Sequence, residues 1–296
     1  MANTQNNDTK DTKKNSKLFL TAASALAAVV LIAVAVAGWQ LYKSAQAEKK
    51  MQQLAELTWT PIESSGKGAS GSADGQDVAE NDPLSQEKTY PTLSQANIPV
   101  PEKYVDIPTL QAEANTDIYS WIYIPDTGID YPVLQHPEEM DYYLKHNIDG
   151  RNGYPGCIYT QRMNSKDWTD KNTVIYGHNM GNGTMFAHLH YYEDAVFFEE
   201  NPYVYIYTED TLRAYQIFAA YEYSDWNLLY TDTSTDESYL RYLDSIFENE
   251  GFNNNFDTGV EFDARDRIIT LSTCIKNKDT RRYLVQAVLV AEESSV

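Results

Sequence analysis

The sequence predicts a mostly β domain of about eight short strands with one inserted helix, behind an N-terminal membrane helix and a polar spacer. Three observations support this fold class: an uncharged apolar stretch at residues 18–38, a Gly/Ser-rich segment at residues 64–75, and short β-branched and aromatic runs that begin at Trp121. Strands of this kind close naturally into an antiparallel barrel or a sandwich.

The apolar stretch at residues 18–38 predicts a transmembrane helix, since about 20 apolar residues suffice to cross a hydrocarbon layer of about 30 Å. A buried core helix would carry a polar stripe, which is absent here. A cleaved signal peptide is the second alternative, because residues 45–47 (Ala-Gln-Ala) match a cleavage pattern, but signal peptides have apolar regions of only about 7–15 residues. We therefore expect a cytoplasmic tail at residues 1–17, a single-pass anchor at residues 18–40, and the larger domain outside the cell.

The part of the chain beyond the anchor is strongly acidic. The whole chain holds 23 Lys and Arg against 43 Asp and Glu, and seven of the basic and three of the acidic residues lie among the first fifty, which leaves 16 against 40 in residues 51–296. Such a surface repels nucleic acid and anionic lipid headgroups, so neither is an expected partner. No cofactor or metal site is expected, because the histidines and carboxylates show no ligand spacing.

The Gly/Ser-rich segment and the acidic, Pro-containing stretch after it predict a flexible stalk over residues 41–101 and a folded domain over residues 102–296. Apolar residues recur at helical spacing from Tyr239 to Phe247, behind a Ser234-x-x-Glu237 capping box, which predicts a helix over residues 234–249. Strands are expected at residues 121–124, 130–134, 157–160, 172–177, 203–207, 212–223, 267–273 and 283–290.

A cysteine, a histidine and a pair of arginines lie at the ends of predicted strands, and together such residues can support catalysis by a cysteine nucleophile. Cys274 ends a β-forming run, and a cysteine nucleophile needs a proton acceptor or an imidazolium nearby. His178 also directly follows a strand, and a hairpin would return Arg281 or Arg282 close to the cysteine, where an arginine could stabilise an oxyanion. Each residue also has a structural interpretation: a buried thiol, which could pair with Cys157, a structural histidine, or solvated arginines.

Several blocks of the sequence together resemble the class B sortases, which are cysteine transpeptidases of Gram-positive bacteria. The run Thr270-Leu-Ser-Thr-Cys274 resembles the TLxTC signature of sortases, and Tyr176-Gly-His178-Asn-Met resembles their histidine motif. Further matches follow the family order at residues 129–135, 141–144, 183–186 and 282–287. The likeness covers residues 104–292 and implies an eight-stranded sortase-type β-barrel with an N-terminal helical segment and an inserted helix before the catalytic strand.

The resemblance also implies the roles of individual residues. Cys274 would be the nucleophile, His178 the general acid and base, and Arg282 the donor to the oxyanion. Arg282 is preferred to Arg281 by its place in the aligned strand, and since side chains alternate across a strand, only one of the two can point at the cysteine. Ser272 and Thr273, next to the nucleophile, are expected substrate contacts.

On this resemblance, the enzyme would cleave a C-terminal sorting motif of exported surface proteins through a thioacyl intermediate. It would then transfer them to an amine of the peptidoglycan cross-bridge or its lipid-linked precursor. A pilus polymerase that joins pilin subunits, a hydrolase that uses water, and a non-catalytic surface binding domain remain alternatives. Three departures from the family pattern lie outside the catalytic positions and bear on substrate preference: Met140, Cys157 and Gln161.

Overall fold

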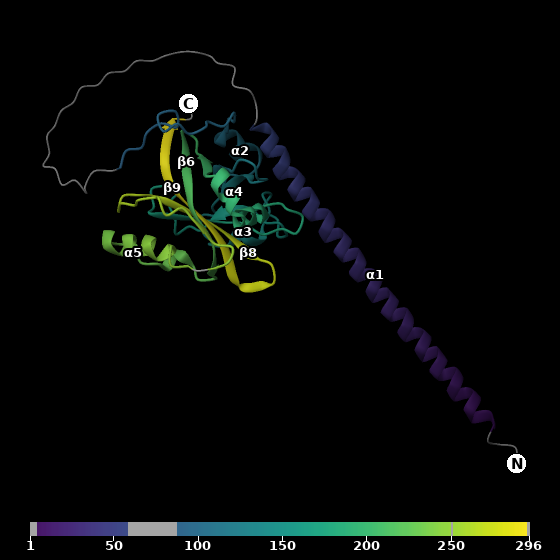
Figure 1. The fold of residues 1–296 in the computed structure, drawn as a ribbon. Helices are drawn as coiled ribbons and strands as arrows, with labels where there is room; N and C mark the ends of the chain where they lie inside the picture. Colours follow the sequence, from purple (N-terminus) through teal and green to yellow (C-terminus); the bar gives the residue numbers. More distant parts are fainter. Residues whose placement is uncertain (1–4, 59–87, 250, 295–296) are drawn as a thin grey trace, which may run out of the picture. The chain divides into compact units, whose positions relative to one another are not determined.

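The computed structural model describes residues 5–58, 88–249 and 251–294, so the expected spacer at residues 64–75 lies outside the described residues. Two compact units, Met1–Gln46 and Ala47–Val296, divide the chain. The helix α1 (Gln5–Leu57) fills the described part of the first unit and continues into the second (Figure 1). The predicted anchor lies within α1, whose Leu26–Leu57 part contains an 18-residue window with a mean hydropathy of 1.8 and is long and apolar enough to cross a membrane.

The strands of the second unit form a closed eight-stranded barrel, as predicted. Its order is β5-β1-β2-β3-β4-β8-β9-β6, and a β5–β6 pairing closes the ring. The barrel is not wholly antiparallel, because β2–β3 and β4–β8 pair in parallel. The barrel strands are β1 (Ile118–Tyr123), β2 (Asp130–Leu134), β3 (Ile158–Thr160), β4 (Asn172–Tyr176), β5 (Tyr203–Tyr207), β6 (Thr211–Ser224), β8 (Ile268–Ile275) and β9 (Lys278–Ser294). The two-residue strand β7 (Asn255–Phe256) pairs with β6 outside the ring.

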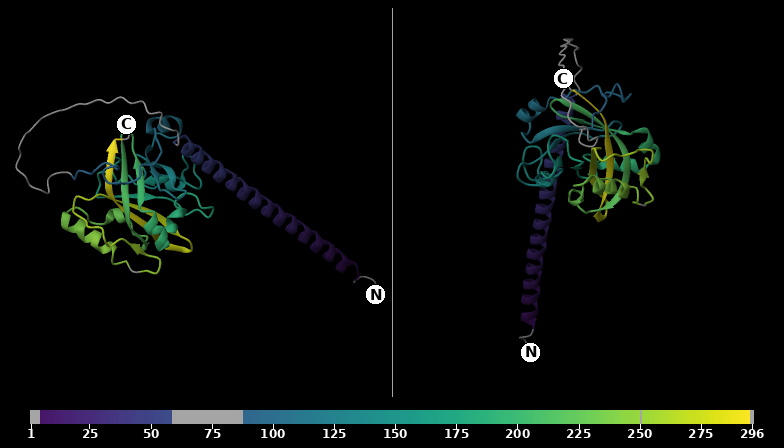
Figure 2. Two further views of the ribbon diagram at one scale, coloured as in Figure 1. Left: turned by 45° about the horizontal axis from the view of Figure 1, so that its top comes forward. Right: turned by 90° about the vertical axis from the view of Figure 1, so that its left-hand side faces the viewer.

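Alternate residues of the barrel strands face two different cores. Leu271 and Val285 pack in the barrel interior, whereas Ile268 and Leu284, on the other face, pack against the helix α5 (Asp236–Ile246). The predicted helix is therefore confirmed, and Figure 2 shows it outside the strands. The remaining short helices are α2 (Ile107–Glu113), α3 (Tyr142–Lys145), η1 (Ala187–Glu193), α4 (Ala195–Glu200) and η2 (Leu228–Tyr230).

The helix α5 begins one residue later than its predicted cap. Thr235 is the N-cap, and its hydroxyl accepts a hydrogen bond from the Ser238 amide, while the Ser238 hydroxyl accepts one from the Thr235 amide. The expected cap, Ser234, instead donates its hydroxyl to Asp232 at 2.6 Å. The predicted Ser-x-x-Glu box is therefore corrected to a Thr-x-x-Ser box, in which both hydroxyls reach the free backbone amides of the first turn.

The compact unit extends N-terminal of the boundary expected at residue 102. Met51 and Leu54 of α1 are buried, Leu93 is fully buried, and the Tyr205 hydroxyl donates to the Pro99 carbonyl at 2.6 Å. Parts of the segment expected to be a stalk therefore pack within this unit.

Candidate active site

Cys274 lies at the end of β8 with its side chain exposed, directly opposite Arg282 of β9 in the antiparallel register. Directly opposed residues of antiparallel strands point to the same face, with their Cβ atoms about 4.5–5.5 Å apart. This face is the outer one, because Ile268 and Leu284, which alternate in step with Cys274 and Arg282, pack against α5. Cys274 is unpaired, and Cys157 is also free and buried, so the two cysteines form no disulfide.

The two arginines of β9 have different partners. Arg281 points to the other face of the sheet, where its Nε donates to Glu222 at 2.8 Å. Arg282 donates through Nη1 to the carbonyl oxygens of Asp279 and Arg281, both at 2.9 Å. A guanidinium has five N–H donors, so these two bonds leave Nε and Nη2 of Arg282 as donors for a further group.

His178 leaves the sheet at the same level as Cys274. The parallel pairing of β4 with β8 runs to Tyr176 opposite Ser272, and the Gly177 amide donates to the Ser272 carbonyl at 3.2 Å. His178 and Cys274 each lie two residues beyond that last pair, at neighbouring ends of adjacent strands.

The His178 ring is oriented by two contacts. Its Nε2 lies 2.7 Å from the Leu144 carbonyl oxygen, and the ring of Tyr154 lies against it at a centroid distance of 5.1 Å. Because a carbonyl only accepts, Nε2 carries the hydrogen in this contact, which leaves Nδ1 for proton transfer. Among the described residues, no hydrogen bond joins His178 or Arg282 to the Cys274 thiol.

Gly177 sets the backbone immediately before His178. A Cβ at this position would lie 2.5 Å from Cδ1 of Ile158 and 2.6 Å from Cγ of Phe186. Only glycine allows this close approach. The Phe186 amide in turn donates to the His178 carbonyl at 2.9 Å, so the loop after the histidine folds back onto it.

The two expected substrate contacts differ in orientation. Ser272 lies on the same face of β8 as Cys274 and is 6% exposed. Thr273 points to the interior, is 2% exposed, and donates its hydroxyl to the Gly177 carbonyl at 2.8 Å. Thr273 therefore joins β8 to the start of the histidine loop.

A polar network connects the strands beside the catalytic face with the loop before α5. Gln161, where the family resemblance leads us to expect Asp, donates to Asp141 at 2.7 Å and accepts from Asn227 at 3.0 Å. Asn227 also accepts from the Tyr176 hydroxyl at 3.3 Å. Burial, with the charge of Asp141, raises the pKa of both Tyr159 and Tyr176, so both phenols remain protonated donors.

Sequence reasoning missed two residues of this site, Asn179 and His190. The side-chain amide of Asn179 donates a hydrogen bond to the backbone carbonyl of Cys274, and Nε2 of the His190 ring lies 3.1 Å from the same oxygen. No local pattern signals a contact between His190 and Cys274, which lie 84 residues apart in the chain. The adjacency of Asn179 to His178 was the only available signal.

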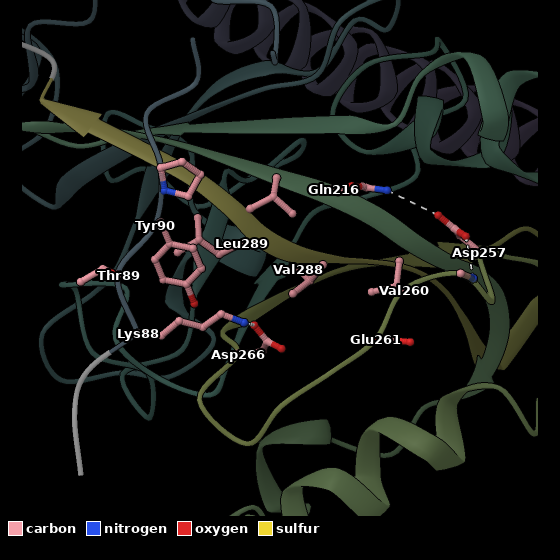
Figure 3. Close-up of a pocket in the computed structure, with 13 residues that line it drawn as sticks. Lys88, Thr89, Tyr90, Gln216, Asp257, Val260, Glu261, Asp266, Val288 and Leu289 are labelled. Carbon is pink, nitrogen blue, oxygen red and sulfur yellow. Dashed lines mark hydrogen bonds and ion pairs between the residues drawn. The ribbon is translucent and has the colours of Figure 1, made fainter. Parts of the chain in front are cut away.

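A cavity of about 490 Å³ lies elsewhere on the barrel (Figure 3). Val288 lines it, and Val288 pairs with Ile268, six residues from Cys274 and so about 20 Å along β8. None of the predicted site residues lines this cavity. Within the described part of the chain, no group of three His, Cys, Asp or Glu side chains could hold a metal ion.

Known proteins are similar to this chain in sequence and in fold. A family model described as the sortase domain matches residues 122–290. Sortase B of Listeria monocytogenes is 37% identical over 181 residues, which cover 60% of this chain and 72% of the relative. Sortase B of Staphylococcus aureus is 31% identical over 179 residues, with coverages of 60% and 71%.

Solved structures agree with the sequence relatives. Sortase B of Clostridium perfringens superposes with a TM-score of 0.56 and 33% identity, covering 62% of this chain and 98% of that one. A sortase B–substrate complex of Staphylococcus aureus superposes with a TM-score of 0.56 and 29% identity, covering 67% of this chain and 89% of that one.

Proposed function

The chain belongs to the sortase family, and we propose that Cys274, His178 and Arg282 are the residues that carry its chemistry. It is a class B-like cysteine transpeptidase, as its relatives indicate. The observation that supports the three assignments is the strand register, in which Arg282 lies opposite Cys274 and His178 leaves the neighbouring strand at the same level.

In the first half of the proposed reaction, the Cys274 thiolate attacks the carbonyl carbon of a Thr in a sorting motif. A C–S bond forms and the carbonyl electrons move to oxygen, giving an oxyanion that the free N–H groups of Arg282 stabilise. His178 donates a proton to the leaving amine as the peptide C–N bond breaks. The product is a thioester on Cys274.

In the second half, an incoming amine attacks the thioester. His178 accepts a proton from this amine, a new amide bond forms, and the C–S bond breaks to return the thiolate of Cys274. Ser272, on the same face as Cys274, contacts the substrate. Thr273 points to the opposite face and supports the site through its hydrogen bond to the Gly177 carbonyl.

The proposed substrates are exported surface proteins with a C-terminal sorting motif, and the proposed acceptor is an amine of the peptidoglycan cross-bridge or of its lipid-linked precursor. The N-terminal helix would hold the enzyme in the cell membrane as a single span, with the N-terminus in the cytoplasm and the catalytic unit outside. This topology is tested by protease added to intact cells, which should degrade the barrel but spare an N-terminal tag.

The experiment that tests the function incubates the full-length chain with a library of sorting-motif peptides, with and without an amine acceptor. We expect the wild-type chain to cleave a subset of peptides and to form an amide with the acceptor. Cys274→Ala should abolish both cleavage and the acyl mass increase on the protein, while Cys157→Ala should keep both. Full cleavage by Cys274→Ala would overturn the assignment.

Two alternatives give different outcomes in the same assay. A pilus polymerase would favour a lysine side chain of a pilin subunit over a cross-bridge amine as acceptor. A non-catalytic binding domain would bind peptides without cleavage and would tolerate loss of Cys274. Exposure of Cys274 and burial of Cys157 favour an enzyme, because a nucleophilic thiolate must be accessible.

A further inference from the structure

The backbone carbonyl of Cys274 interacts with two side chains instead of a neighbouring strand. Nδ2 of Asn179 donates to it at 3.0 Å, and Nε2 of His190 lies 3.1 Å from it. These two nitrogen atoms are also 3.0 Å from each other. The three groups therefore form a closed triangle beside the peptide of the proposed nucleophile.

This triangle extends the parallel β4–β8 ladder beyond its last strand pair. The Gly177 amide donates to the Ser272 carbonyl, and in a regular parallel ladder the next bond would run from the amide of residue 179 to the Cys274 carbonyl. Asn179 instead forms a backbone bridge with Met185, and its side-chain amide makes the bond to Cys274. Because Asn179 directly follows His178, this bond fixes the spacing between the two proposed catalytic residues.

Two further contacts hold the His190 ring in place. Its Nδ1 lies 2.6 Å from Oε1 of Glu193, whose other oxygen accepts from Asn253 at 2.9 Å. The ring stacks on Tyr283 at a centroid distance of 5.0 Å, and the His190 side chain is only 20% exposed. The fixed ring therefore presents Nε2 to the triangle.

Both protonation states of His190 support the triangle. With one proton, on Nδ1 and bonded to Glu193, Nε2 accepts from one Asn179 hydrogen while the other bonds the Cys274 carbonyl. With two protons, Nε2–H donates to the Cys274 carbonyl directly. In each state His190 holds the strand end that carries Cys274.

We propose that His190, held by Glu193, is a positioning residue for transpeptidation, which keeps Cys274 and His178 at a fixed separation through Asn179 and the Cys274 carbonyl. This inference rests on the proposed roles of Cys274 and His178. Small displacements of reacting groups lower the rate of chemistry steeply, by roughly a hundredfold for about 1 Å. Substrate binding on the outer face depends much less on this spacing.

His190→Ala should therefore lower kcat by roughly ten- to a hundredfold with KM nearly unchanged. His190→Gln should recover most of kcat, because an amide supplies both a donor and an acceptor at a similar reach. Glu193→Gln, which keeps an oxygen acceptor but loses the charge, should have a smaller effect. His188→Ala is the matched control, since His188 lies in the same helix and accepts from the Gly128 amide at 2.7 Å, away from Cys274.

The experiment measures kcat and KM of the full-length variants with the peptide that the wild-type chain cleaves fastest, together with Tm and the rate of Cys274 alkylation by iodoacetamide. We expect alkylation of His190→Ala to continue, because the thiol remains exposed, while kcat falls. If His190→Ala unfolds, Asn179→Ala tests the same triangle and should show the same loss of kcat.

The outcomes separate this inference from the proposed function. A wild-type chain that cleaves no peptide contradicts the proposed function itself. A wild-type chain that turns over, with His190→Ala and Asn179→Ala as fast as His188→Ala, contradicts only the positioning role. A loss of kcat in His190→Ala that His190→Gln does not recover at all would also count against it.

Discussion

Arg281 and Arg282 are neighbours in the sequence, but the alternation of side chains across β9 separates their roles. Removing an oxyanion donor typically lowers kcat by about 10²–10³-fold, so we expect a loss of this size for Arg282→Ala. Arg282→Lys should recover little, because an ammonium cannot reproduce the planar fork of donors. Arg281→Ala, which breaks the ion pair with Glu222, should keep its kcat. Steady-state kinetics of the three variants test this, and equal losses for the two alanine variants would contradict the assignment.

The ionisation of Asp263 makes the stability of the fold depend on pH in the acidic range. Burial raises the pKa of this carboxyl, but hydrogen bonds from Arg265 and the charge of Lys88 outweigh burial and lower the pKa from 3.8 to about 2. A carboxyl with a lowered pKa in the folded state stabilises the fold above its unfolded pKa, and this contribution disappears as the pH falls through the folded value.

The Asp263→Asn variant should therefore have a lower Tm than the wild type at neutral pH, and this difference should shrink as the pH falls from about 4 to about 2. Thermal unfolding of both chains between neutral pH and pH 2 measures it. Glu261→Gln is the control, because Glu261 is exposed and has no hydrogen bond or ion pair among the described residues. A Tm difference that stays constant over this range would contradict the expectation.

At the scale of elements, the cap of α5 offers a direct comparison of two adjacent hydroxyl residues. Thr235→Ala removes the acceptor for the Ser238 amide and should lower the free energy of unfolding by about 1 kcal/mol. Ser234→Ala removes only a hydrogen bond to Asp232 outside the helix and should cost less. Urea unfolding followed by circular dichroism measures both. A larger effect for Ser234→Ala would restore the cap that the sequence predicted.

The elements that the sequence predicts well are those with a strong local pattern. Every barrel strand and α5 have such a pattern, because a run of β-branched and aromatic residues, or apolar residues at helical spacing, appears within a single segment. The parallel pairing of β4 with β8 has no local pattern, since it joins Thr173 and Ile269, which lie 96 residues apart in the chain. The assignment of Cys274, His178 and Arg282 rests on the resemblance to the sortase motifs, because by residue pattern alone each of them also has a structural interpretation. The contacts of Asn179 and His190 with Cys274 could not be predicted, because they depend on that long-range pairing.

At the scale of the whole molecule, the sequence misplaces the start of the folded unit. The stretch before residue 102 is acidic and contains prolines, which is typical of a linker. However, Leu93 and Ile98 are buried, and Lys88 pairs with Asp263 and Asp266. Isolated apolar residues without periodicity give no signal of packing, so composition alone could not show that this stretch covers the barrel.

A truncation series locates this boundary. A chain that begins at Ala47 keeps Met51, Leu54 and Leu93, which are at most 6% exposed, and should unfold at the same urea concentration as the full chain. A chain that begins at residue 102 loses all three. Because full burial of such a side chain contributes about 1.5–3 kcal/mol, the shorter chain should lose several kcal/mol of unfolding free energy.

Leu93→Ala in the full chain keeps this boundary testable even if the shorter chain fails to fold. Large-to-small substitution of a fully buried leucine typically costs about 2–5 kcal/mol, through lost apolar contact and the cavity left behind. Val100→Ala, at a half-exposed position in the same stretch, is the matched control and should cost little. Equal urea midpoints for Leu93→Ala and Val100→Ala would mean that the stretch before residue 102 contributes nothing to the fold, as a flexible stalk would.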